Sequence, residues 1–435
     1  MRRLAGLAFS AGLAALAAGC GSQHAGGADG PTGPNPVLPP PHHYLLPPMG
    51  VAKVVGWSAG ATPEAAPGLK VTALATGLPH PRWVYPLPNG DILVAEANDP
   101  KAPPPTRAKD IVMGLVMGHA GAATPSANRI ELIRPGAPGQ PASRSVFISG
   151  LDHPFGMVLV GNDLYVADTD AVLRFPYTPG ATSITAPAVK MAELPGGPIN
   201  HHWTKSIIAS PDGTKLYVTV GSNSNIGENG LAAEYGRAAI YEMDRASGRM
   251  RLFATGLRNP NGMGWEPTTG ALWTVANERD ELGDDLVPDY LTSVKDGAFY
   301  GWPYSYYGQH VDTRVQPQRP DLVKTAVAPD YALGSHVAPL GMTFDTGSTL
   351  PARYRGGAFV GEHGSWNRAN PHGYKVVFVP FQGGKPNGQP VTILGGFMKT
   401  KGKVQGRPVG VAFDRTGALI VADDVGGVIW RVTGG

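Results

Sequence analysis

Residues 161–168 read Gly161-Asn162-Asp163-Leu164-Tyr165-Val166-Ala167-Asp168. A turn sequence is followed here by a short run of β-prone residues and then by an acidic residue, which is typical of the second strand of a β-hairpin. The same order, with a polar cluster at its end, recurs in six places along the chain. The turn glycines of the six copies are Gly90, Gly161, Gly213, Gly270, Gly357 and Gly417.

A second pattern precedes each copy, a loop that leads into another apolar strand. The loop contains Gly-Leu-x-x-Pro at 77–81, 150–154 and 256–260, and looser versions stand at 200–203, 335–339 and 406–408. The turn glycines are 52 to 87 residues apart, whereas a four-stranded blade takes about 40–50 residues, so some blades carry insertions. The paired recurrence predicts an all-β, six-bladed β-propeller. The alternative is a β-sandwich or a multidomain β-protein with chance turn similarity.

The ends of the repeat region and its insertions complete this prediction. We expect the last strand, 428–432, to join a blade that residues near 69–71 complete. Residues 109–120 have the apolar spacing of a short amphipathic helix, which would cap the propeller edge. Residues 282–307 form the larger insertion, and we expect it to shape the pocket.

Composition agrees with a turn-rich globular protein. The chain has 435 residues, of which 60 are Gly and 43 are Pro, and 42% are hydrophobic. Charged residues make up only 16%, below the roughly 25% of an average domain, which argues against coiled coils. The formal net charge is +3, and the sequence has no cluster of basic residues of the kind that nucleic-acid binding needs. We therefore expect no nucleic-acid partner.

The N-terminus has the layout of a secretory signal, with two arginines, an apolar run and Gly19-Cys20. Because Cys20 is the only cysteine, its place in a lipobox-like Leu16-Ala17-Ala18-Gly19-Cys20 predicts a bacterial lipoprotein acylated at Cys20. An ordinary signal peptide is the alternative. We therefore expect a signal peptide at 1–19, a Gly/Pro-rich tether at 20–50 and the propeller at 51–435. The predicted location is the cell envelope, either periplasmic or anchored to the outer membrane.

Propeller symmetry predicts where the functional residues meet. The loops before the first strands and after the second strands of all blades lie at one end of the central axis. The residues at these positions are Arg82, His153, His201, His202, Arg258, Asn259, His336 and Arg407, with Glu96, Asn98, Asp168, Asp170, Glu278, Arg279, Asp280, Glu362, His363, Asp423 and Asp424. A ring of this chemistry suits a polyanionic ligand with a bound cation. Structural histidines and turn-capping carboxylates are the alternative reading.

Several longer stretches carry a family resemblance. They are 125–130, His202-Trp203-Thr204, Ser210-Pro211-Asp212-Gly213, Gly256-Leu257-Arg258-Asn259-Pro260, 277–285, Tyr300-Gly301-Trp302-Pro303, His363-Gly364-Ser365-Trp366-Asn367-Arg368 and 406–410. From about Gly68 to Val432 the chain resembles the pyrroloquinoline quinone (PQQ)-dependent glucose/sorbosone dehydrogenase family, and is most similar to its L-sorbosone dehydrogenase branch. The resemblance implies a six-bladed propeller.

The resemblance also implies roles for single residues. It assigns His202 as the catalytic base, Arg258 and Asn259 as contacts of the quinone, and Arg407 as the partner of a PQQ carboxylate. Backbone carbonyls in the loop of Glu278, Arg279 and Asp280 would hold a Ca²⁺ ion, so that this loop is the predicted metal site. His336 is a further predicted cofactor-binding residue.

The chain departs from the family pattern in three places. His201 stands where the soluble glucose dehydrogenases have an Asp, and a second arginine close to the position of Arg407 is missing. The family's cofactor-binding Lys is absent too, and Arg368 is the predicted substitute.

Together these features predict an enzyme that oxidises a sugar or sugar aldehyde by hydride transfer to PQQ, with a histidine base and Ca²⁺. A Ca²⁺-dependent propeller lactonase or hydrolase, and a non-catalytic binding propeller, are the alternatives. The electron acceptor is not identified, because the sequence has no haem-binding Cys-x-x-Cys-His.

Overall fold

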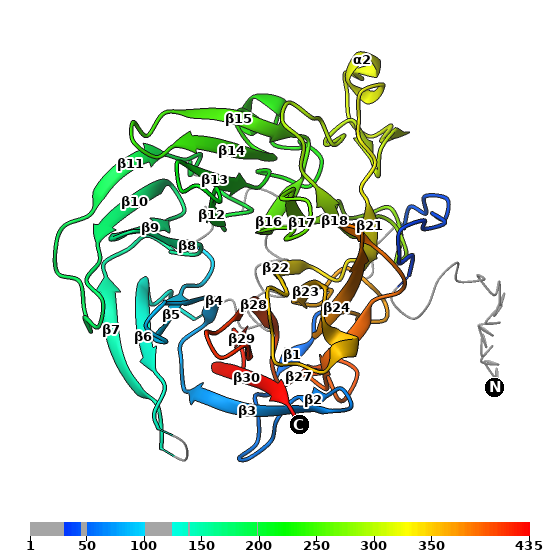
Figure 1. Ribbon diagram of the computed structural model, residues 1–435. Coiled ribbons are helices and arrows are strands. Elements are labelled where there is room, and N and C mark those ends of the chain that lie inside the picture. The colour runs from blue at the N-terminus through cyan, green and yellow to red at the C-terminus, as the bar shows by residue number, and fades with distance from the viewer. Residues whose placement is uncertain (1–29, 45–49, 101–123, 138–139, 198) are drawn as a thin grey trace, which may run out of the picture.

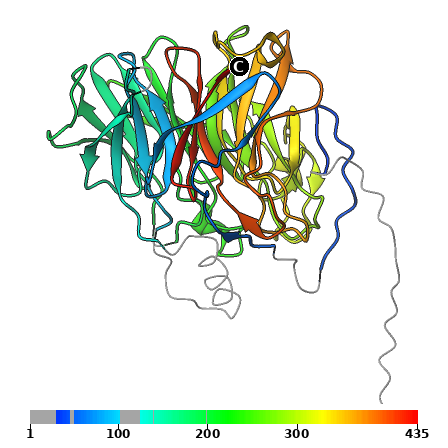
Figure 2. The ribbon, with the colours of Figure 1, turned by 90° about the horizontal axis from the view of Figure 1, so that it is seen from below.

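The computed structural model describes residues 30–44, 50–100, 124–137, 140–197 and 199–435 (Figure 1). These residues form six antiparallel sheets that surround a central axis as the blades of a propeller; five have four strands, and one has six because short strands are added to its four. The side view in Figure 2 shows the strands standing roughly along that axis. The predicted all-β, six-bladed propeller is confirmed.

The first three blades follow the chain directly. Blade 1 contains β4 (Pro81–Pro86), β5 (Ile92–Glu96), β6 (Arg129–Arg134) and β7 (Ser143–Ser149). Blade 2 contains β8 (Met157–Val160), β9 (Asp163–Ala167), β10 (Ala171–Pro176) and β11 (Val189–Glu193). Blade 3 contains β12 (Ile207–Ala209), β13 (Lys215–Val220), β14 (Ala239–Asp244) and β15 (Met250–Thr255).

The other three blades include connections that are distant in sequence. Blade 4 contains β16 (Asn259–Trp265), β17 (Leu272–Asn277), β18 (Pro288–Ser293) and β21 (Tyr331–Ser335). Blade 5 contains β22 (Pro339–Phe344), β23 (Gly357–Glu362), β24 (Lys375–Gln382) and β26 (Val391–Gly395), with β2 (Glu64–Ala65) outside it. Blade 6 contains β28 (Pro408–Phe413), β29 (Leu419–Asp423), β30 (Val428–Gly434) and β3 (Leu69–Thr76). All six predicted hairpin strands are second strands of blades.

Blade 6 closes the ring with both ends of the chain. Its outer strand β3 pairs antiparallel with the C-terminal strand β30, as the sequence predicted, and Val71 lies opposite Val432. Val432 and Trp430 are buried in the core between blades 5 and 6. The closure therefore combines a main-chain ladder with apolar packing.

The inner strands of neighbouring blades approach each other closely. A Cβ atom on Gly341 of β22 would lie 2.2 Å from the carbonyl oxygen of Val409 in β28. A Cβ atom on Gly262 of β16 would lie 2.4 Å from the backbone nitrogen of Met342 in β22. These distances are too short for any side chain, so glycine permits the ring to be this narrow.

The predicted insertion at 282–307 is partly wrong, because it contains β18, a regular blade strand. The insertion in blade 4 instead lies between β18 and β21, and it contains β19 (Ser305–Tyr306), β20 (His310–Val311) and the short helix α2 (Pro320–Val323). Pro288 at the start of β18 hides the strand in the sequence, since proline is otherwise rare in central strands. The predicted helix at 109–120 lies outside the described residues.

Residues 30–44 lie against the propeller, in contrast to the free tether that the sequence predicts for 20–50. Gly33 exchanges two backbone hydrogen bonds of 2.9 Å with Ala332 of β21, and the amide of His42 donates to the carbonyl of Leu282. The predicted signal peptide and Cys20 lie outside the described residues. No helix in the described part of the chain is long and apolar enough to cross a membrane.

We expect Gly341→Ala to lower the free energy of unfolding by about 1–3 kcal/mol, because the added methyl group collides with the backbone of β28. The matched control is Gly395→Ala in β26, where a Cβ would meet only Thr392 at 3.6 Å. Urea unfolding of both variants measures the difference. Equal stability of the two variants would contradict the close approach of the inner strands.

Candidate active site

A polar cavity of about 240 Å³ lies at one end of the central axis. Its lining includes His80, Arg82, Asp99, His201, His202, Trp203, Arg258, Asn259, Asn277, Glu278, Asp280, Asp289, His336, Leu340, His363, Trp366, Arg407 and Asp424. These residues precede or begin first strands or follow second strands, apart from Asp289 in β18, the third strand of blade 4. The predicted convergence of distant loops therefore holds.

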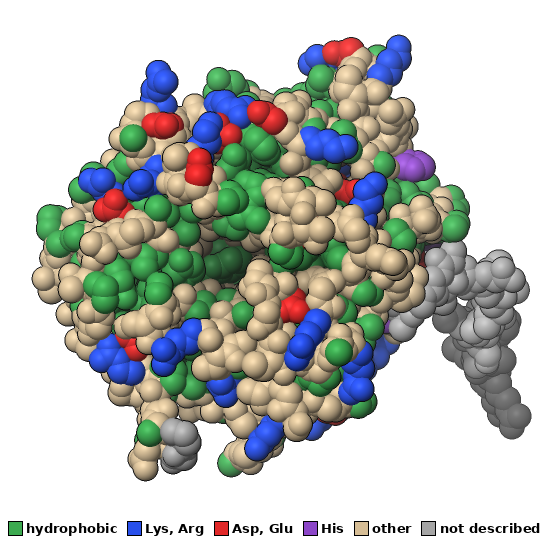
Figure 3. All heavy atoms as spheres, viewed as in Figure 1, with side chains coloured by type: hydrophobic (Ala, Val, Ile, Leu, Met, Phe, Trp, Pro, Cys, Tyr) green, Lys and Arg blue, Asp and Glu red, His purple; other side chains and the backbone are tan. Residues whose placement is uncertain are grey.

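The cavity and the C-terminus lie at opposite ends of blade 6. Val425 lines the cavity just before β30 begins, and the C-terminus follows the end of the same strand. Figure 3, in the view of Figure 1, shows a face whose central hollow is bordered mainly by hydrophobic side chains. The cavity, in contrast, is lined mainly by charged and polar side chains. We therefore place the candidate site in the cavity and not in the hollow of Figure 3.

His202 is held in one orientation by its Nδ1 atom. Nδ1 lies 2.8 Å from the carbonyl oxygen of Ser222 and 3.0 Å from the Ser222 hydroxyl. Because a carbonyl only accepts, Nδ1 carries the proton and the lone pair is on Nε2. Burial, together with the charge of Arg258, lowers the pKa of His202 well below its usual value. His202 is therefore a neutral base in the cavity wall.

Gly221 allows His202 and Asn259 to pack side by side. A Cβ atom on Gly221 would lie 2.5 Å from the Cβ of His202 and 2.4 Å from Oδ1 of Asn259. Gly221 directly follows β13, and Asn259 begins β16. The close contact between blades 3 and 4 thus places these two side chains together.

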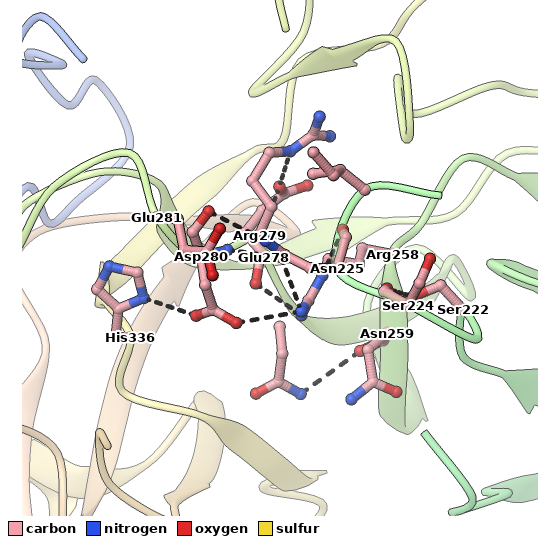
Figure 4. A network of polar contacts seen from close by, with 12 residues as sticks. Ser222, Ser224, Asn225, Arg258, Asn259, Glu278, Arg279, Asp280, Glu281 and His336 are labelled. Carbon is pink, nitrogen blue, oxygen red and sulfur yellow. Dashed lines mark hydrogen bonds and ion pairs between the residues drawn. The ribbon is translucent and has the colours of Figure 1, made fainter. Parts of the chain in front are cut away.

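Arg258 is fixed by four hydrogen bonds (Figure 4). Nη1 donates to the carbonyl of Glu278 at 2.8 Å, and Nη2 donates to Oδ1 of Asn225 and to Oδ2 of Asp280. Nε donates to the carbonyl of Asn225. Because Arg258 is only 3% exposed, its charge stays at one place in the wall.

Asp280 and His336 extend this network (Figure 4). Nδ1 of His336 lies 3.3 Å from Oδ1 of Asp280, and Nε2 lies 3.0 Å from the carbonyl oxygen of Gly283. Burial alone would raise the pKa of Asp280, but the contacts with His336 and Arg258 lower it to about 2. Burial would lower the pKa of His336, but Asp280 raises it above the usual value. The pair is therefore charged near neutral pH.

A second network lies on the wall formed by blades 5, 6 and 1. Oδ2 of Asp424 accepts from Nη1 of Arg82 at 2.6 Å and lies 2.8 Å from Nε2 of His363. Burial would raise the pKa of Asp424, but His363 and Arg82 lower it strongly. Arg407 is 5% exposed, and its Nε and Nη2 atoms have no hydrogen-bond partner among the described residues.

Most of the predicted site residues line the cavity. His202, Arg258, Asn259, His336, Arg407, Glu278 and Asp280 do so. Arg368 does not line it, because its guanidinium pairs with Asp285 at 2.8 Å and donates to the carbonyl of Ser335. The role of Arg368 as a substitute for the family Lys stays a prediction.

The predicted metal loop is occupied by protein contacts. Arg279 is fully buried and pairs with Glu278 and Asp312, away from the cavity lining. The carbonyl of Glu278 accepts from Arg258, and that of Asp280 accepts from Arg314 at 3.1 Å. No group of three or more His, Cys, Asp or Glu residues in the described part of the chain is placed to hold a metal ion. That backbone carbonyls of Glu278, Arg279 and Asp280 hold a Ca²⁺ ion stays a prediction.

Sequence reasoning gave no role to Arg82, His363 or Asp424, and it omitted His80 and Trp366 from the candidate site. His80 directly precedes Pro81, as His153 precedes Pro154, so the repeat itself contained a signal for His80. Trp366 lies in a motif quoted for the resemblance, but nothing in its spacing shows that it faces the cavity.

The family described as TrAA12-like matches residues 139–290 and 312–435. A PQQ-dependent pyranose dehydrogenase of Coprinopsis cinerea is 26% identical over 285 residues, which are 54% of this chain and 36% of that protein. The chain thus spans about a third of that relative. An uncharacterised protein of Borreliella burgdorferi is 27% identical over 292 residues, which are 65% of this chain and 76% of that protein.

Solved structures share the fold at low identity. The calcium structure of a Trichoderma reesei protein of carbohydrate-active enzyme family AA12 has a TM-score of 0.69 and 20% identity, with 88% of this chain and all of that chain covered. The holo form of the PQQ domain of a Coprinopsis cinerea pyranose dehydrogenase has a TM-score of 0.68 at the same identity and coverage. These likenesses support the six-bladed propeller.

We expect His202 and His336, which lie in the wall that also contains Arg258 and Asp280 (the first wall), to differ in charge. At pH 6 His202 should be neutral with its proton on Nδ1, because burial and Arg258 disfavour the cation, whereas His336 should be mainly doubly protonated beside Asp280. Nitrogen-15 NMR of the imidazole rings measures both states, and His202→Gln and His336→Gln assign the signals. A charged His202 at pH 6 would contradict its placement as a base.

Proposed function

The chain belongs to the TrAA12-like family, and we propose that it is an oxidoreductase that uses PQQ to oxidise a sugar. One observation carries the proposal: a neutral histidine base and a buried arginine that forms no ion pair with any described residue line the same cavity. The PQQ-dependent sugar dehydrogenases among its relatives support the cofactor and the substrate class. As the finer form of the proposal, the substrate is an aldose or a sorbosone-type sugar aldehyde.

The residues present fit PQQ, which bears three carboxylates. Two donor nitrogens of Arg407, Nε and Nη2, are buried and have no hydrogen-bond partner among the described residues. Leaving such donors unpaired is unfavourable, and a carboxylate binds them with charge-assisted hydrogen bonds. Arg407 would therefore hold a carboxylate of the cofactor. Asn259, which also lines the cavity, would contact the quinone. The carbonyls of Glu278 and Asp280, the predicted calcium ligands, already accept hydrogen bonds from Arg258 and Arg314. No step below depends on calcium.

When bound, PQQ supplies a quinone that accepts a hydride. The chain contributes the proton acceptor: His202 lines the cavity, and its Nε2, which carries the lone pair, would take the proton of the sugar hydroxyl. The carbonyl of Ser222 keeps the ring in this orientation. Arg258 supplies a positive charge that its four hydrogen bonds fix beside His202, and such a preorganised charge stabilises negative charge that develops in the reaction.

We also propose that the protein is exported and anchored by a lipid on Cys20. The order of charged, apolar and small residues up to Cys20 supports this location. Mass spectrometry of the mature N-terminus after bacterial expression should find an acylated Cys20, and Cys20→Ser should abolish membrane association. An unmodified N-terminus beyond residue 20 would contradict lipidation and leave the oxidoreductase proposal untouched.

The decisive test of the activity is a titration of the purified protein with PQQ. We expect saturable binding and PQQ-dependent reduction of a dye with aldoses. His202→Ala should reduce turnover by about 10²- to 10⁴-fold, because it removes the base, and should change PQQ affinity little. His310→Ala, which changes an exposed histidine of the blade 4 insertion, is the control.

Other outcomes identify the alternatives. Wild-type turnover in His202→Ala would remove His202 from the mechanism. Cleavage of lactones or esters without PQQ would favour a hydrolase, and ligand binding with neither activity would favour a binding propeller. Absence of PQQ binding to the wild-type protein would overturn the proposed function.

A further inference from the structure

Four lysines gather on the surface beside blades 5 and 6. Lys53 lies in β1 (Lys53–Val54) and Lys403 in β27 (Lys403–Val404), whereas Lys399 and Lys401 lie in the loop between β26 and β27 (Figure 1). All four residues are exposed. β1 and β27 pair in parallel, and Lys53 lies directly opposite Lys403. We call these four residues the lysine patch.

The alternation of side chains along the two short strands turns the lysine patch outward. Val404, which follows Lys403, is fully buried, and Val54, which follows Lys53, packs against the core between blades 5 and 6. Because successive side chains of a strand point to opposite faces, Lys53 and Lys403 share the face toward solvent. Val55, two residues after Lys53, is 53% exposed and adds an apolar side chain to the lysine patch.

This arrangement is unfavourable for the protein by itself. Like charges directly opposite each other on paired strands destabilise a sheet. The described lysines that form ion pairs are Lys190, Lys215 and Lys375, so within the described part of the chain no carboxylate pairs with the lysine patch. Glu64 of β2 contacts Gly396, close by in sequence, but it forms no ion pair there. The lysine patch therefore carries four uncompensated positive charges.

The lysine patch borders the cavity. The ammonium group of Lys401 donates to Oδ1 of Asn370 at 2.7 Å, and the amide of Gly50 donates at 2.9 Å to the carbonyl of Trp366, which lines the cavity. Lys53 is three residues from Gly50, so their Cα atoms are at most about 11 Å apart. A molecule that docks on the lysine patch therefore lies next to the cavity.

We propose that the lysine patch is the docking surface for an acidic redox protein that takes up the electrons of sugar oxidation. The proposal rests on the proposed function, because that reaction supplies the electrons. Oxidation of one sugar molecule releases two electrons and two protons. Two haem irons of the partner, one per docking event, are reduced from the ferric to the ferrous state, and the two protons pass to solvent.

A redox protein fits the lysine patch better than an anionic lipid surface does. An apolar residue among charged ones, such as Val55, is typical of protein interfaces, and weak electron-transfer complexes need less than about 1,200 Å² of buried surface. Complementary charge raises the rate of encounter, which suits short and repeated docking. A bilayer on the same lysines would cover the neighbouring cavity, whereas a protein that dissociates after each transfer leaves it open to the next sugar.

The test uses two acceptors that contain the same haem and differ in surface charge. Native cytochrome c is basic, and succinylated cytochrome c is acidic because its lysines carry carboxylates. At low ionic strength, the PQQ-loaded protein should reduce the acidic form faster than the basic form. Lys53→Gln/Lys399→Gln/Lys403→Gln, which keeps the contact between Lys401 and Asn370, should lower the rate with the acidic form by about 10-fold. Added salt should slow the wild type and change this variant little.

The matched control removes the same charge from the end of the blades opposite to the cavity. Lys70 of β3, Lys295 after β18 and Lys385 of β25 (Lys385–Pro386) lie there, and their joint replacement by Gln should leave the rate at the wild-type value. All variants should reduce the small, uncharged acceptor 1,4-benzoquinone equally. The melting temperature of the triple variant of the lysine patch should be no lower than that of the wild type, because a repulsion is removed. An equal loss of rate with benzoquinone and with cytochrome would mean that the cavity is damaged, and would overturn the docking role.

Binding without PQQ separates the docking surface from the proposed function. Isothermal titration calorimetry at low salt should show that succinylated cytochrome c binds to the wild type and to the control, and more weakly to the triple variant of the lysine patch. Such binding without PQQ-dependent oxidation of any sugar would overturn the proposed function and support the docking surface. Equal binding and equal cytochrome reduction by wild type and triple variant would overturn the docking surface alone. So would binding to phosphatidylglycerol vesicles that depends on the lysine patch while cytochrome reduction does not.

Discussion

The contact between the inner strands of neighbouring blades controls the rest of the structure. Because a Cβ on Gly341 would lie only 2.2 Å from a carbonyl oxygen of the next blade, the inner strands are packed backbone to backbone and the ring cannot become narrower. The loops that join these strands start from fixed positions around a narrow axis. Residues as distant in sequence as His202 and Arg407 therefore line one cavity of about 240 Å³.

The two walls of that cavity handle charge in different ways. On the first wall, Arg258 and His336 share Asp280, and their charges surround a histidine that burial keeps neutral. On the second wall, the carboxylate of Asp424 pairs with both Arg82 and His363, whereas Arg407 forms no ion pair with any described residue. A proton acceptor on one side and an excess of positive charge on the other suit an anionic cofactor that reacts with a neutral substrate.

The sequence predicted the blades because each turn and hairpin strand is coded locally, as in 161–168. It also predicted which loops converge, because the position of a loop in the repeat is enough to place it at one end of the axis, without knowledge of side-chain packing. It did not predict that Arg368 pairs with Asp285 or that Arg279 pairs with Asp312, because these partners lie in loops whose course depends on tertiary contacts. Arg82 received no role for the same reason, as Asp424 reaches it only through ring closure.

The pairing of β3 with β30 has a consequence for biosynthesis. Blade 6 takes its outer strand from the first part of the propeller and its other three strands from the last residues of the chain. The ribosome makes β3 before the other strands of the six blades and β30 after them, so the edges of β3 stay unpaired until β30 emerges. The seam between blades 6 and 1, where Arg82 meets Asp424, is therefore complete only after blade 6 has been made.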